Sequence, residues 1–90
     1  MANTVKKYES PNLNTAFTAK LLGAAIRAKR SQSRLRLEDA ASLCGVAKQT
    51  LMKIEHGQGT SQLASILQIC DGLGIKLQIL PWADEANDGW

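Results

Sequence analysis

The chain has 90 residues, of which 44% are apolar and 21% charged, and its formal net charge is +3. This length allows one domain with a modest core, and the composition excludes collagen-like, low-complexity and largely disordered proteins. No apolar run approaches the roughly 18 residues of a membrane span, and the first residues lack the apolar stretch of a secretory signal, so we expect a cytosolic protein without membrane contact.

Four short helices are predicted between an N-terminal arm and a C-terminal strand. Residues 1–14 are polar and aperiodic, which is typical of a flexible arm. Apolar residues then recur at helical spacing, in stripes that begin at Phe17 in the first helix and include Leu63 and Leu67 in the last. Ser61 is the expected N-cap of the last helix. The predicted helices span 15–32, 37–43, 48–56 and 61–73, within a helical domain of residues 15–74.

After Gly74 the apolar spacing changes from 3.6 to 2 residues. Ile75, Leu77 and Ile79 alternate with more polar residues, which indicates a strand over 75–81. A lone strand leaves both of its edges unpaired, and the chain offers no second strand of similar quality. We therefore expect the strand to pair with its copy in a homodimer; the alternative is an extended segment packed on its own helices. Residues 82–90 form an acidic tail.

The second and third predicted helices are joined by a tight turn at Gly45, an arrangement typical of DNA-binding helix-turn-helix motifs. Small Ala41 and Gly45 suit a close crossing of these helices, and Val46 supplies an inward apolar residue after the turn. The second helix of such a motif enters the major groove, where its first long polar side chains meet base edges. The predicted base-reading residues are Lys48, Gln49, Thr50 and Lys53.

Charge is distributed unevenly along the chain. Residues 1–60 hold ten basic and four acidic residues, whereas 61–90 hold one basic and four acidic residues. The densest basic stretch contains no acid, which fits either an ordinary solvated face or a surface that binds phosphates. The predicted DNA phosphate contacts in this stretch are Arg27, Lys29, Arg30, Arg34 and Arg36.

The stretch LEDAASLCGVAKQTLMKIEHG resembles the helix-turn-helix signature of the Cro/C1-type, or Xre, family. An alanine is followed four residues on by glycine, then by an aliphatic residue and a Thr-aliphatic-x-basic-Ile-Glu-x-Gly run. The resemblance covers about residues 19–74 and implies an all-α, phage-repressor-like bundle of four to five helices, here with one C-terminal strand that pairs across a homodimer. Arg36 and Leu37 depart from the family's usual Thr-Gln start, which leaves Arg36 to contact phosphate by charge.

The ending Gly-Ile-Lys-Leu-Gln-Ile-Leu-Pro narrows the resemblance to HipB-type antitoxins. That likeness implies a homodimeric repressor of its own operon, bound to palindromic double-stranded operator DNA in the bacterial cytoplasm and nucleoid. It also implies a HipA-like kinase toxin as partner, alone or within a larger complex. Trp82 and Trp90 of the acidic tail are the candidate toxin contacts, because tryptophan is frequent at interface hot spots. Two alternatives stay open: an Xre-type regulator without a toxin, and a dimeric protein-interaction adaptor without specific DNA binding.

The remaining reactive side chains predict neither an enzyme nor a cofactor or metal site. His56 has no nucleophile or carboxylate at a catalytic spacing and suits a cap at a helix end. Cys44 and Cys70 fall within apolar patterns and are expected to be buried, reduced thiols. Glu55 is expected to pair with an arginine of the first helix.

Overall fold

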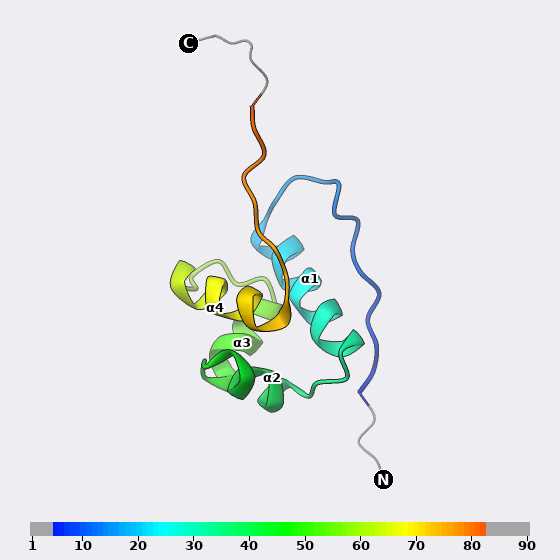
Figure 1. Cartoon of the computed structure of the whole chain (residues 1–90), viewed down its shortest axis with the longest axis vertical. Helices are drawn as coiled ribbons and strands as arrows, with labels where there is room; N and C mark the ends of the chain where they lie inside the picture. Colours follow the sequence, from blue (N-terminus) through cyan, green and yellow to red (C-terminus); the bar gives the residue numbers. More distant parts are fainter. Residues whose placement is uncertain (1–4, 83–90) are drawn as a thin grey trace.

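A computed structural model describes residues 5–82, which form four helices (Figure 1). The all-helical fold expected from the sequence is confirmed, and the second and third helices match their predicted bounds to within one residue. Residues 83–90 of the predicted tail, with Trp90, lie outside the described residues. No helix within residues 5–82 is both long and apolar enough to cross a membrane. The helices are α1 (Ala19–Gln32), α2 (Leu37–Cys44), α3 (Lys48–Glu55) and α4 (Leu63–Leu73).

Two predicted helix starts are wrong. α1 begins at Ala19 because the Thr18 hydroxyl accepts a hydrogen bond from the Leu21 N–H at 3.0 Å and caps the helix there. Phe17 therefore precedes α1 and is exposed. α4 begins two residues after Ser61, and its N-cap residue, Gln62, makes no side-chain capping bond.

The core lies where the four helices meet. Ile26 of α1, Leu51 of α3 and Ile69 of α4 are fully buried, and Ala40 and Ala41 of α2 pack against them.

The buried stripe of α4 differs from the predicted one. It consists of Ile69, Cys70 and Leu73, whereas Leu63 and Leu67 are exposed. The apolar stripe of α4 is therefore wider than its buried side, and Leu63 and Leu67 lie at the exposed edge of the stripe.

α1 crosses α3 at Gly23, a position that the sequence patterns did not single out. A Cβ at this residue would lie 2.3 Å from the Ile54 carbonyl oxygen and 2.8 Å from that of Glu55. Only glycine fits this crossing without a backbone shift, because real Cβ atoms do not approach an oxygen so closely.

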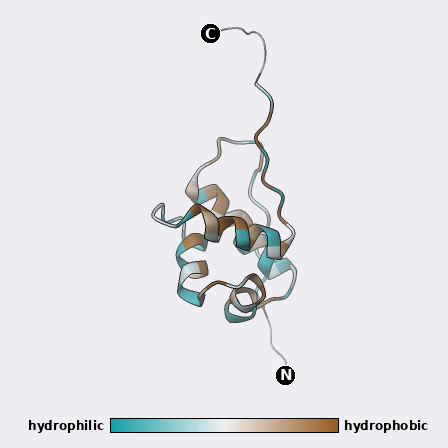
Figure 2. Ribbon diagram, turned by 60° about the vertical axis from the view of Figure 1, so that its left-hand side comes forward, coloured by the Kyte–Doolittle hydropathy of each residue, from teal (hydrophilic) through white to brown (hydrophobic). Residues whose placement is uncertain are grey.

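Residues 75–82 leave the helical body as an extended segment (Figure 1), and hydrophobic and hydrophilic residues alternate over 75–79 (Figure 2). Only Ile75 packs against the core, while 40% of Leu77 and 85% of Ile79 are exposed. The segment is therefore not folded onto its own helices, which contradicts the alternative considered for it. Residues 5–82 form no strand pairing among themselves, so the strand over 75–81 stays a prediction about a second copy.

Candidate nucleic-acid interface

α2 and α3 form a helix-turn-helix around Gly45. Gly45 has a φ of +75°, in the left-handed region that favours glycine, and its N–H donates to the Ser42 carbonyl. The Val46 N–H donates to the Ala41 carbonyl, which completes the bond pair that ends many helices. Val46 then packs against the core, as predicted. The close crossing predicted at Gly45 is wrong, because a Cβ there would meet only the Gln68 amide, at 3.4 Å.

α4 supports this turn through Gln68, a residue that the sequence patterns did not single out. Its Nε2 atom lies 3.4 Å from the carbonyl oxygens of both Cys44 and Gly45, so both hydrogen bonds are long. A side chain of α4 thus contacts the backbone between the two helices of the motif.

α3 turns long polar side chains toward solvent. Its buried side is formed by Leu51, Ile54 and Glu55. At about 100° per residue, Gln49 and Lys53 lie opposite that buried side. Of the four predicted base-reading residues, Lys48, Gln49 and Lys53 are exposed and Thr50 is half-buried.

Two further side chains, Met52 and His56, are exposed near Gln49 and Lys53. Met52 follows Gln49 by three residues and His56 follows Lys53 by three, and this spacing was the available sequence signal that they share a face of the helix. His56 is the C-cap residue of α3, at the helix end where the sequence placed it. The last carbonyls of α3 accept from the backbone N–H groups of His56, Gly57 and Gln58. His56 therefore remains at the surface beside the polar face of α3.

The predicted phosphate contact of Arg30 is corrected, because its guanidinium group binds other protein groups. Its Nε and one terminal nitrogen donate to the two Glu55 carboxylate oxygens at 2.5 and 3.0 Å, and the other donates to the Leu35 carbonyl at 2.8 Å. The exposed fractions of the Arg30 and Glu55 side chains are only 11% and 5%. The guanidinium is thus occupied inside the protein, and the expected pairing of Glu55 with an arginine of the first helix is confirmed.

The other four predicted phosphate contacts differ in their surroundings. Lys29 and Arg34 are exposed, and neither forms an ion pair within residues 5–82. Arg36 is exposed with its Nε 3.1 Å from an Asp39 oxygen, and this hydrogen bond is the main cause of its raised pKa. Arg27 is half-buried, with its guanidinium carbon 4.4 Å from the centre of the Tyr8 ring.

Arg34 occupies a strained backbone position in the turn between α1 and α2. Its φ is +61°, and no other non-glycine residue among residues 5–82 has a positive φ. Its N–H donates to the Ser31 carbonyl and the Leu35 N–H to the Arg30 carbonyl, the same helix ending that Gly45 makes. An exposed arginine therefore stands where the backbone favours glycine.

Replacing Arg34 with glycine should raise the free energy of unfolding by about 0.5–1 kcal/mol. The left-handed conformation strains an L-residue by roughly 1–2 kcal/mol, and the greater freedom of glycine in the unfolded chain offsets part of the relief. Urea unfolding of Arg34→Gly and Arg34→Ala separates strain from charge, because both lose the cation and only glycine relieves the backbone. Equal stabilities of the two variants would contradict this account.

Cys44 and Cys70 are both buried and free, as the sequence predicted. Burial raises the pKa of both thiols, and the neighbouring Cys44 adds to the shift at Cys70. Both thiols therefore stay protonated near neutral pH and pack as small apolar groups.

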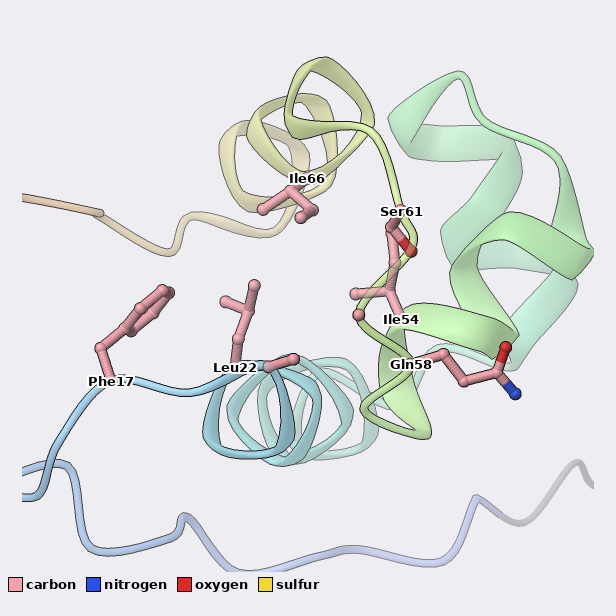
Figure 3. Close-up of a pocket in the computed structure, with 8 residues that line it drawn as sticks. Phe17, Leu22, Ile54, Gln58, Ser61 and Ile66 are labelled. Carbon is pink, nitrogen blue, oxygen red and sulfur yellow. The ribbon is translucent and has the colours of Figure 1, made fainter.

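A mostly apolar pocket opens between the start of α1, the loop after α3 and α4 (Figure 3). The side chains of Phe17, Leu22 and Ile66 point toward its centre. None of its lining residues carries an acid, base or thiol, so the pocket supports packing more readily than chemistry.

This geometry defines a DNA-binding helix-turn-helix protein, and comparisons place the chain within a family. The family model for the helix-turn-helix domain matches residues 21–78. The HTH-type transcriptional regulator y4mF of Sinorhizobium fredii is 32% identical over 59 residues, which are 66% of this chain and 78% of that protein. The chain therefore belongs to the helix-turn-helix family of transcriptional regulators.

Solved structures share the fold. Chains from the HipA-HipB-O2-O3 complex and from the HipB-O4 20mer complex each superpose with a TM-score of 0.68 at 16% sequence identity. The match covers 77% of this chain and 97% of each of those chains. The expected likeness to HipB-type proteins is thus confirmed at the level of the fold.

Proposed function

We propose that this regulator is a sequence-specific repressor whose α3 reads base edges in the major groove. The carrying observation is that Gln49 and Lys53 stand on the exposed side of α3, opposite its buried side. Glutamine pairs with the N6 and N7 atoms of adenine, and lysine donates to the O6 and N7 atoms of guanine. Lys48 is exposed beside them, while the half-buried Thr50 has less reach toward a base.

Phosphate contacts in this proposal come from Lys29, Arg34 and Arg36, which are exposed around the end of α1 and the start of α2. Arg36 reaches a phosphate only by sharing or releasing Asp39. Each contact releases counterions from DNA, which makes the affinity fall steeply as salt rises.

Gln49→Ala should relax base preference at one position of each half-site. Losing a bidentate base contact costs about 1–3 kcal/mol of discrimination, while the phosphate contacts keep general affinity. Fluorescence anisotropy with a preferred site and its single-base variants measures this, with Gln62→Ala, an exposed glutamine at the start of α4, as the matched control. Equal losses on specific and scrambled DNA would exclude Gln49 as a base reader.

A homodimer is the proposed form that binds a palindromic operator. Ile75, Leu77 and Ile79 are the proposed dimerisation residues, and the last two are exposed on a segment that extends from the body. Leu63 and Leu67 of α4 add exposed apolar area that a second copy would cover. Pairing of two such segments would satisfy the strand edges and bury these side chains together.

Gln78→Pro should weaken this dimer, because proline removes a backbone N–H from the proposed strand pair. Gln78→Ala is the control, since it changes the same side chain and keeps the N–H. Sedimentation of both variants at tens of micromolar gives the result: a dimeric alanine variant and a more dissociated proline variant. A wild-type chain that sediments as a monomer would refute the dimer.

A HipA-like kinase toxin is the proposed second partner, which would make this repressor an antitoxin that regulates its own operon. Support comes from the fold shared with HipB chains and from Trp82, the first residue of the acidic tail, which is 76% exposed. Tryptophan is a frequent anchor in protein interfaces. Removing residues 82–90 should weaken toxin binding in calorimetry and spare DNA binding; equal toxin affinity would move the contact to the helical body.

A further inference from the structure

The segment before α1 is held against the C-terminal end of that helix (Figure 1). The Tyr8 N–H donates to the Ser31 hydroxyl at 2.9 Å, and the Gln32 side-chain amide donates to the Tyr8 carbonyl at 2.9 Å. Ser31 is fully buried and donates in turn to the Ala28 carbonyl at 3.1 Å. Both backbone polar groups of Tyr8 are therefore fixed by the last turn of α1.

The Tyr8 ring lies close to two cations. The Arg27 guanidinium carbon is 4.4 Å from the ring centre, and the Lys6 ammonium nitrogen is 5.3 Å from the same ring centre. Lys7 adds another exposed cation, and Glu9 is the one acid in residues 5–14.

This positive charge is not neutralised within the described part of the chain. The ion pairs there are Arg30 with Glu55 and Arg36 with Asp39, and neither involves Lys6, Lys7 or Arg27. Like charges that converge without a counter-charge repel each other, and the repulsion is relieved when a polyanion binds.

Ser31 links the docked segment to the turn that leads into the helix-turn-helix. Its hydroxyl accepts from Tyr8, and its carbonyl accepts from the Arg34 N–H at 3.0 Å. Ser31 thus holds both the segment that carries Lys6 and Lys7 and the backbone of Arg34, the exposed cation after α1. The turn then runs directly into α2, so both groups of cations border the motif.

We propose that residues 5–10 belong to the DNA interface, with Lys6 and Lys7 contacting backbone phosphates and Tyr8 positioning them. The inference rests on the proposed function and names duplex DNA as the ligand. In the rival explanation these cations only complement the negative C-terminal end of the α1 dipole, which would give them a role in stability alone.

The salt dependence of DNA binding tests the proposal. The double variant Lys6→Gln/Lys7→Gln should lower the slope of log affinity against log salt by roughly 0.9 for each lost contact. Lys20→Gln is the matched control, since Lys20 is exposed in the first turn of α1, about 18 Å from Gln32 along the axis. Its slope should equal that of the wild type.

The outcomes separate this inference from the proposed function. A wild-type chain without salt-dependent DNA binding removes both. Steep wild-type binding that the double variant reproduces, or a slope that falls equally with Lys20→Gln, overturns the inference alone. A double variant that loses thermal stability and keeps the wild-type slope likewise overturns it in favour of the helix-dipole explanation.

Tyr8 variants test the positioning step. Tyr8→Ala removes the ring that both cations approach and should lower the salt slope toward that of the double variant. Tyr8→Phe keeps the ring and the backbone anchors and should retain the wild-type slope. Thermal melting verifies that both variants are folded. A wild-type slope in the folded alanine variant would contradict a positioning role for Tyr8.

Discussion

Replacing Glu55 with alanine should lower the free energy of unfolding by about 3–5 kcal/mol. The change leaves the Arg30 guanidinium buried with only the Leu35 carbonyl as a protein partner. A domain of this size has a total stability of roughly 5–15 kcal/mol, so the variant should be partly unfolded at moderate temperature. Because the pair joins α1 to α3, loss of DNA binding should follow the loss of folded protein.

Asp39→Ala is the control for Glu55→Ala, since it breaks the exposed ion pair with Arg36. The two side chains of that pair are about half exposed, and ion pairs in contact with solvent contribute little to stability. Urea unfolding followed by circular dichroism compares the two variants. Similar small losses in both would show that the Arg30–Glu55 pair is screened by solvent rather than buried.

Gly23→Ala should destabilise the protein by roughly 1–2 kcal/mol. The added methyl group would overlap the carbonyl oxygens of Ile54 and Glu55, and overpacking of this kind typically costs about 1–3 kcal/mol. A helix gains up to about 1 kcal/mol when alanine replaces glycine, so a net loss requires the steric effect to exceed that gain.

The matched control is Gly59→Ala, because nothing lies within 4 Å of a Cβ at Gly59 and its φ is not positive. Its stability should stay within about 0.5 kcal/mol of the wild type. Thermal melting of the two variants tests the helix crossing. A Gly23→Ala protein as stable as Gly59→Ala would mean that α1 and α3 are not in backbone contact.

The sequence predicted α2, the turn and α3 well, because local signals agreed there. A glycine in the left-handed conformation, two short apolar patterns and an inward Val46 all concern neighbouring residues. α1 and α4 were predicted less well. The Thr18 cap competed with an apolar pattern that extended back to Phe17, and the apolar stripe of α4 is wider than the side that packs on the other helices.

The candidate site was predicted where exposure follows from helix periodicity and missed where it depends on contacts between distant residues. Lys48, Gln49 and Lys53 were expected at the surface, and they are exposed. Arg30 looked like its exposed neighbours because a charge pattern does not reveal a partner 25 residues away. The contact of Tyr8 with Ser31, across 23 residues, likewise had no local signal.

Selection of binding sites from a random duplex DNA library tests the central claim that α3 reads sequence. The wild-type chain should enrich one defined site with two symmetric halves, and Gln49→Ala should enrich the same site with one degenerate position in each half. Failure of the wild type to enrich any sequence, or an identical site from both proteins, would contradict base reading by Gln49 on α3.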